Sequence, residues 1–205
     1  MIQTVTKQFQ ESGEVITAQY PDAELVKPIL SELILKYDEA EQQYHKEPQQ
    51  LTFVNSVENS GPKPDSFRRL FEEHEDFKKI TDFALQTIKE TVPLFPNIDK
   101  ANNNPYILDA WGVLYKPDTS TETWTSGLEP HSHWPATWSF VYYVDACDTC
   151  APIVFPNCTD ANLHRPRTGL LIIFPGWIAH AVPPHKCNHN RISIAGNIVI
   201  KHRLE

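Results

Sequence analysis

The chain has 205 residues and a formal net charge of −8, and its 40% hydrophobic and 21% charged residues are typical of a globular protein rather than a disordered one. The negative charge argues against nucleic acid as a partner, because proteins that bind nucleic acid usually carry a basic patch. No apolar segment approaches the roughly 20 residues that cross a bilayer, and the first residues lack the apolar core of a secretory signal, so we expect a cytoplasmic protein without a membrane partner.

The first hundred residues carry mainly helical patterns. A short strand is predicted at residues 15–20, and a helix over residues 22–47, where Pro28 favours a regular helix only from about residue 27 onward. "LTFVNSV" predicts another short strand, and a second helix is predicted over residues 66–91, which Pro93 stops. The apolar stripe of the first helix comprises Leu25, Ile29, Leu33 and Tyr37, widened by Val26, Leu30 and Ile34.

From residue 104 onward, short apolar runs alternate with turns. The runs are "YILDAWGVLYK", "TETWTSGLEPH", "ATWSFVYYVD", "APIVF", "GLLIIFP", "IAHAVPP" and "RISIAGNIVIK". Seven or eight strands at this spacing predict an all-β sandwich or barrel. We therefore expect a mainly β fold with α support. It would form a single domain over 1–205, in which 1–100 is a helical support region packed on one sheet and 101–205 is the β core.

Two histidines stand one residue apart in "EPHSHWP". Because alternate side chains of a strand share a face, His131 and His133 can converge on one point. Neutral imidazole is a common ligand of zinc, copper, nickel and iron, and His180 in "FPGWIAHAVPP" is the candidate third ligand. A polar pair without a metal is the alternative for the first two. The remaining histidines are expected to be packed (His74) or to lie in polar loops or on the surface (His45, His164, His185, His189 and His202).

Arg191 begins the last long run, "RISIAGNIVI", with ten residues between it and His180. A buried arginine on a barrel strand is costly unless it meets an anion, and its planar fork suits a carboxylate. Ser193 lies on the same strand face and could add a hydroxyl to that carboxylate. Taken alone, the pair is better explained as an exposed arginine and serine at the start of a strand. In combination with the three histidines, the ligand-binding interpretation is favoured.

These residues make the chain resemble the 2-oxoglutarate- and Fe(II)-dependent oxygenases, which have a double-stranded β-helix (jelly-roll) core. It is similar in particular to a branch of small oxygenases with a His-x-His motif. The matching positions, spread over about residues 105–200, are Trp111 and Tyr115, "HSHW", Tyr142 and Tyr143, "GLLIIFP", His180, and Arg191, Ser193 and Asn197.

The resemblance implies a role for each motif. His131, His133 and His180 would hold Fe(II) in the jelly-roll core, and Arg191 and Ser193 would bind the far carboxylate of the co-substrate 2-oxoglutarate. The activity implied is hydroxylation of a substrate with release of succinate and CO2. The partners would be small molecules, and the sequence does not specify the primary substrate.

His133 stands where most of this superfamily has a carboxylate, and Glu129 is the alternative carboxylate ligand. Three neutral ligands leave the metal its full double positive charge. Two other functions therefore stay open. One is a cupin-like three-histidine dioxygenase that does not use 2-oxoglutarate, and the other is a jelly-roll that binds a ligand without catalysis.

The four cysteines suggest a second metal. Cys147 and Cys150 form a Cys-x-x-Cys pair, Cys158 follows the next run, and Cys187 lies in "PPHKCNHN". Such a set is typical of structural zinc. If the strand after His133 runs away from the iron, its end and the "PPHKCNHN" turn meet at the far end of the barrel. The alternative is four reduced cysteines in loops.

Overall fold

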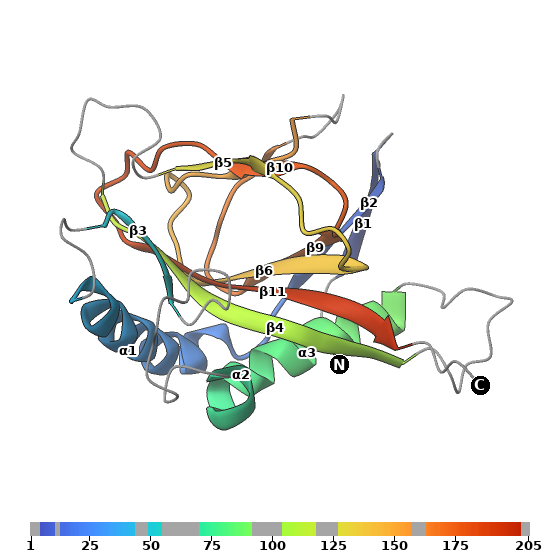
Figure 1. The fold of residues 1–205 in the computed structure, drawn as a ribbon, viewed down its shortest axis with the longest axis horizontal. Helices are drawn as coiled ribbons and strands as arrows, with labels where there is room; N and C mark the ends of the chain where they lie inside the picture. Colours follow the sequence, from blue (N-terminus) through green and yellow to red (C-terminus); the bar gives the residue numbers. More distant parts are fainter. Residues whose placement is uncertain are drawn as a thin grey trace, which may run out of the picture.

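The protein is described by a computed structural model that covers residues 5–10, 13–43, 49–54, 70–91, 104–117, 127–156 and 163–201. Within these ranges the strands form two antiparallel sheets that face each other, with helices on the outer side of the larger one (Figure 1). A mainly β fold supported by helices on one sheet was predicted, and the structure confirms it.

The larger sheet has seven strands among the described residues, and β11 is near its centre. In spatial order the strands are β1 (Val5–Gln10), β2 (Gly13–Gln19), β9 (Leu170–Pro175), β6 (Trp138–Asp145), β11 (Arg191–Lys201), β4 (Asn104–Tyr115) and β3 (Leu51–Val54). The smaller sheet contains β5 (Leu128–His131), β10 (His180–Val182), β7 (Ile153–Val154) and β8 (Leu163–His164).

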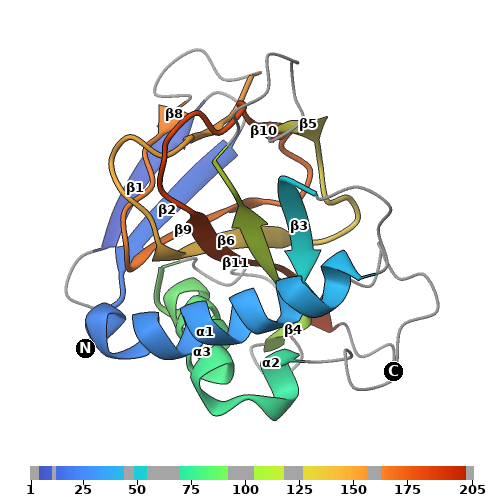
Figure 2. The same ribbon diagram turned by 90° about the vertical axis from the view of Figure 1, so that its left-hand side faces the viewer.

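The first half of the chain contributes strands as well as helices to this arrangement. The predicted strand at residues 15–20 is β2, which pairs with β9, and "LTFVNSV" contains β3, which pairs with β4 beside α1 (Figure 2). The strands β1 and β8 were not predicted. Both edges of the larger sheet therefore come from residues before 100, whereas its centre comes from residues after 100.

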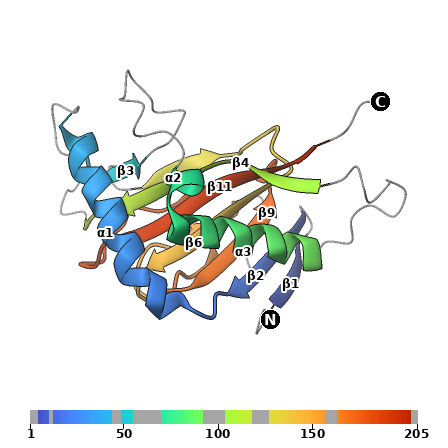
Figure 3. The ribbon, with the colours of Figure 1, turned by 90° about the horizontal axis from the view of Figure 1, so that it is seen from below.

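Three helices, α1 (Ala23–Gln42), α2 (Leu70–Glu73) and α3 (Glu75–Thr91), lie across the outer face of the larger sheet (Figure 3). None of the helices in the described part of the chain is long and apolar enough to cross a membrane. Burial of apolar side chains fixes the helix layer to the sheet. The shared core includes Leu30 and Ile34 of α1, Phe77 and Ile80 of α3, and Leu114, Phe140 and Ile194 of the sheet.

The structure corrects the predicted start and the predicted face of α1. The helix begins at Ala23 and contains Pro28, whose missing N–H leaves only the carbonyl of the exposed Glu24 without its helical donor. The buried line is Val26, Leu30 and Ile34, whereas Leu25 and Ile29 are 71% and 44% exposed. The two apolar lines are adjacent on the helix, and only the line of Val26, Leu30 and Ile34 faces the sheet directly.

The second predicted helix is interrupted at His74, which separates α2 from α3. The His74 carbonyl accepts a hydrogen bond from the Lys78 N–H, so it starts a new helix. Acidic residues stand on both sides of the break, Glu72 and Glu73 before it and Glu75 and Asp76 after it. Negative charge is unfavourable at a helix C-terminus and favourable at an N-terminus, so a restart is favoured here. Residues 66–69 of this prediction lie outside the described residues.

We predict that Leu30→Ala lowers the free energy of unfolding by about 2–5 kcal/mol, because it leaves a cavity between α1 and the sheet. The control is Leu25→Ala on the exposed side of the same helix, which should change the stability by less than about 0.5 kcal/mol. Urea unfolding of the two variants measures both effects. Equal losses in the two variants would show that the face of α1 is assigned wrongly.

Candidate active site

The three predicted histidines come together on the smaller sheet and the loop that follows β5. His131 ends β5 directly opposite His180 of β10, and His133 lies two residues further on. The ring centroids of His131 and His180 are 4.3 Å apart, and each is 5.1 Å from that of His133. One nitrogen from each ring lies within 4.8 Å of the others, so the group could hold a metal ion.

Backbone carbonyls orient two of these rings. The Nδ1 of His131 is 2.8 Å from the carbonyl oxygen of Glu129, and the Nδ1 of His180 is 3.3 Å from that of Ile178. A neutral imidazole that donates its Nδ1–H to a carbonyl keeps a free lone pair on Nε2. The arrangement therefore favours the tautomer that binds a metal through Nε2.

His133 is held through its backbone. Its N–H donates to the Gly176 carbonyl at 2.7 Å, and its carbonyl accepts from the Ala136 N–H at 2.8 Å. A Cβ at position 176 would be 2.3 Å from the Ala136 carbonyl oxygen, so only glycine allows this close approach. These contacts place the segment after β5 against the turn that follows β9.

The electrostatic setting keeps His133 and His180 neutral. Burial lowers the pKa of His180 to about 3 and that of His133 to about 4, and the neighbouring imidazoles act in the same direction. Both rings are thus unprotonated at neutral pH. This is the form that a metal ion requires.

The histidines open onto a cavity of about 270 Å³ that also contains Arg191 and Ser193. The structure therefore brings all five predicted site residues to one place. Sequence reasoning missed Phe53 of β3, which also lines the cavity. The period-2 pattern of "LTFVNSV" showed a strand, but nothing local indicated that it would pair with β4 beside the site.

Arg191 is 2% exposed and lies between two aromatic rings. Its guanidinium carbon is 4.5 Å from the centroid of Tyr115 and 4.9 Å from that of Tyr143, and Nη2 donates to the Tyr143 hydroxyl at 3.4 Å. Burial raises the pKa of Tyr115 to about 12, so this ring stays uncharged beside the cation. Within the described residues, Arg191 has neighbours that stabilise its charge but forms no ion pair that neutralises it.

Several buried polar atoms around the cavity have no hydrogen-bond partner among the described residues. They are Nε of Arg191, Oγ of Ser193 and Nε1 of Trp111. Such atoms are rare because leaving them unsatisfied costs about 1–3 kcal/mol each. A carboxylate at this end of the cavity would accept hydrogen bonds from the arginine and the serine. The site thus fits an anionic ligand.

The three-histidine group contains no carboxylate. Glu129 is exposed, and it contributes only its backbone carbonyl to the orientation of His131. No acidic residue is among the described residues that line the cavity. Three histidines are compatible with Fe(II), because imidazole is an established ligand of this ion.

Comparison with known proteins provides independent information on this site. Residues 156–197, which include His180, Arg191 and Ser193, match the sequence profile of a family described as "Putative 2OG-Fe(II) oxygenase". The chain resembles the 2-oxoglutarate- and Fe(II)-dependent oxygenases. The match covers the distal half of the predicted motif and not the His-x-His pair. Among curated proteins, no sequence is significantly similar to this chain.

Solved structures share the fold at low sequence identity. AviO1 from Streptomyces viridochromogenes Tue57 is 12% identical, with a TM-score of 0.55 over 91% of this chain and 89% of that protein. A prolyl-4-hydroxylase from Pseudomonas putida is 15% identical, with a TM-score of 0.53 over 93% of each chain. The viral collagen prolyl hydroxylase of Paramecium Bursaria Chlorella virus-1, solved with 2OG, is 14% identical, with a TM-score of 0.50 over 89% of this chain and 94% of that protein. The jelly-roll fold predicted from the resemblance is confirmed.

We predict that metal-free protein loses stability as the pH falls from about 6.5 towards 4. An unfolded histidine titrates near pH 6.5, whereas His133 and His180 in the folded state titrate near 4 and 3. Between these values the unfolded chain binds more protons, so the free energy of unfolding decreases with falling pH by up to about 1.4 kcal/mol per pH unit for each group.

The test is urea unfolding of chelator-treated protein at several pH values, compared with His180→Asn. The variant lacks one of the two groups, so its stability should depend less steeply on pH over this range. Parallel curves for the two proteins would contradict the buried, neutral state of His180.

Proposed function

We propose that the chain, acting as one domain over residues 1–205, is a non-haem oxygenase that depends on Fe(II) and 2-oxoglutarate and hydroxylates a substrate. The observation that carries the proposal is that the buried Arg191 shares one cavity with the three-histidine group. The family match over residues 156–197 also supports an oxidoreductase of the dioxygenase type. The cytoplasmic location stays a prediction from the sequence.

In this proposal each residue has a defined part. His131, His133 and His180 would hold Fe(II), with Nε2 as the ligand atom in His131 and His180, and Arg191 and Ser193 would hold the far carboxylate of 2-oxoglutarate. Bound Fe(II) supplies the reaction with O2 that decarboxylates 2-oxoglutarate and oxidises the substrate. One O2, one 2-oxoglutarate and one C–H bond give succinate, CO2 and a hydroxylated product.

The chain's own contribution is positioning and exclusion of water. The Tyr115 and Tyr143 rings flank the Arg191 guanidinium, so its donors are aligned before a carboxylate arrives. Apolar side chains, among them Val141, Phe174 and Val182, line the same cavity. Such walls strengthen the attraction between the guanidinium and a carboxylate by lowering the local dielectric constant.

A second function is favoured by the ligand set alone. A group of three histidines without a carboxylate is also suited to a cupin-like dioxygenase that does not use 2-oxoglutarate. Such an enzyme has no need for a buried arginine in its cavity, whereas a 2-oxoglutarate enzyme does. Arg191 therefore distinguishes the two candidates.

The proposal predicts that anaerobic titration of Fe(II)-loaded protein with 2-oxoglutarate produces a weak visible charge-transfer band, which His180→Ala abolishes because a metal ligand is lost. Arg191→Met should keep Fe(II) binding and weaken 2-oxoglutarate binding about 10–100-fold, since hydrogen bonds to a charged group contribute about 1.5–3 kcal/mol. The matched control is Lys186→Met, which removes an exposed cation outside this cavity and should change the affinity by less than about twofold.

Release of succinate with uptake of O2, measured with candidate substrates, then tests turnover. Binding of Fe(II) without any band on addition of 2-oxoglutarate would favour the second candidate. If the protein bound neither Fe(II) nor 2-oxoglutarate, the remaining candidate would be a jelly-roll that binds a ligand without catalysis.

A further inference from the structure

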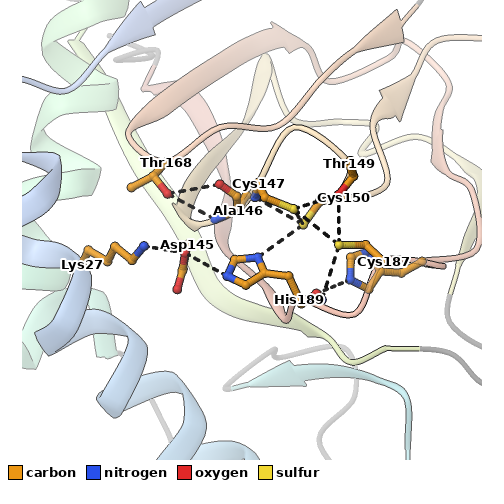
Figure 4. A network of polar contacts seen from close by, with 10 residues as sticks. Lys27, Asp145, Ala146, Cys147, Thr149, Cys150, Thr168, Cys187 and His189 are labelled. Atoms are coloured by element: carbon orange, nitrogen blue, oxygen red, sulfur yellow. Dashed lines mark hydrogen bonds and ion pairs between the residues drawn. The ribbon is translucent and has the colours of Figure 1, made fainter.

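We infer that Cys147, Cys150, Cys187 and His189 form a structural zinc site, separate from the histidine cavity (Figure 4). The first two residues follow β6, and the last two lie in the loop between β10 and β11. The proposal does not depend on the oxygenase function. It differs from the four-cysteine site predicted from the sequence, because a histidine takes the place of Cys158, which lies outside the described residues.

The ligand atoms of Cys147, Cys150 and His189 all lie within 4.8 Å of one another, and the Sγ of Cys187 adjoins that of Cys147. The Sγ of Cys147 is 3.4 Å from that of Cys150 and 3.4 Å from that of Cys187, and the Sγ of Cys150 is 3.6 Å from the Nδ1 of His189. Tetrahedral zinc with Zn–S bonds of roughly 2.3 Å holds its sulfurs roughly 3.8 Å apart, with sulfur–nitrogen separations of roughly 3.5 Å. For these three pairs, only small shifts would therefore admit the ion. No disulfide links these three cysteines.

His185 is the competing histidine, because it also lies within ligand distance of Cys150 and Cys187. Both of its ring nitrogens have backbone partners. The Ala151 N–H donates to Nδ1 at 3.3 Å, and Nε2 lies 2.5 Å from the carbonyl oxygen of His189, to which it donates. His185 is fully buried in this role. Its hydrogen bonds hold the loop that presents His189, and His189 keeps Nδ1 directed at the sulfurs.

Charged and polar groups around the cluster match the needs of a zinc–thiolate site. The Nε2 of His189 is 3.4 Å from the Asp145 carboxylate, which in turn forms an ion pair with Lys27 of α1 at 2.7 Å. A carboxylate on the second nitrogen of a zinc-bound histidine is a recurring arrangement, because it fixes the ring and raises its basicity. Figure 4 shows this chain of contacts from α1 to the sulfurs.

The sulfurs also receive hydrogen bonds that would offset thiolate charge. The N–H of Cys147 donates to the Sγ of Cys150 at 3.4 Å, and the N–H of His189 donates to the Sγ of Cys187 at 3.4 Å. The Thr149 hydroxyl is 3.1 Å and 3.3 Å from the Sγ atoms of Cys147 and Cys187. Hydrogen bonds to the ligand atoms of a metal site fix the orientation of the ligands and adjust their basicity.

Four protein ligands leave no open position on zinc, so the site is structural rather than catalytic. It would connect the segment after β6 with the loop before β11, and His189 is two residues from Arg191. The described residues around the hollow at Cys147, Cys187 and His189 are all different from those that line the histidine cavity. Zinc would thus fix the start of β11 without touching the candidate iron site.

The test begins with zinc content, measured on full-length protein purified with zinc and dialysed. The background is His180→Ala, so that the histidine group does not retain the metal. We expect about one zinc per chain. In this background, His189→Ala and Cys147→Ser should each lose most of the zinc, whereas Cys158→Ser should keep it and serves as the matched control. The melting temperature should fall in the two variants that lose zinc and on treatment with a chelator.

Zinc X-ray absorption on the same background provides a readout that needs no cysteine variant, should Cys147→Ser fail to fold. The expected shell is three sulfurs at about 2.3 Å and one nitrogen at about 2.0 Å. A shell of four sulfurs, or loss of zinc in Cys158→Ser but not in His189→Ala, would overturn the assignment of His189. Zinc-free protein that stays folded, or a stable Cys147–Cys150 disulfide in the purified protein, would overturn the site altogether.

Discussion

The positive charge of Arg191, almost fully buried beneath the cavity, is the constraint around which the rest of the site is organised. Removing an ion from water costs several kcal/mol, which the surroundings must offset. The Tyr115 and Tyr143 rings offset part of this cost through their negative faces, and one hydroxyl accepts a hydrogen bond from the guanidinium. Neither ring supplies a full negative charge. Among the described residues nothing neutralises this cation at the end of the cavity, and the attraction for an anionic ligand follows from this arrangement.

The strand β11 delivers this charge to the cavity and also holds the larger sheet together. It pairs with β4 along its whole length and with β6 on the other side, so Arg191 lies opposite Tyr115 while Ser193 lies opposite Tyr143. Further along, Asn197 accepts a buried hydrogen bond from Ser139 at 2.9 Å, next to a bulge. Arg191, Ser193 and Asn197 thus have different positions in the strand. The first two face the cavity, and the third connects two strands through its hydrogen bond with Ser139.

Sequence reasoning predicted the parts of the site that local periodicity determines, and it missed those that depend on distant pairing. His131 and His133 were found because alternate residues near a strand end converge, and Arg191 because a charged residue opens an apolar strand. His189 was assigned to a polar loop, although "CNHN" places it two residues from Cys187; its approach to Cys150 depends on how two turns meet in space. The break at His74 and the exposure of Leu25 were also missed, because helical spacing alone does not show which of two adjacent lines meets the sheet.

The replacement of a carboxylate by His133 has a consequence for charge balance. Three neutral imidazoles, a divalent ion and Arg191 would place three positive charges around a cavity whose described lining contains no acidic side chain. A carboxylate metal ligand would offset one of these positive charges. With three histidines, the bound small molecule must supply that negative charge instead. A dicarboxylate with one end at the metal and the other at Arg191 neutralises two of them, and a neutral or singly charged ligand leaves more of the repulsion in place. In the proposed oxygenase, the three-histidine set would therefore strengthen the preference of the cavity for a doubly charged ligand, and His133 and Arg191 would act in the same direction from its opposite ends.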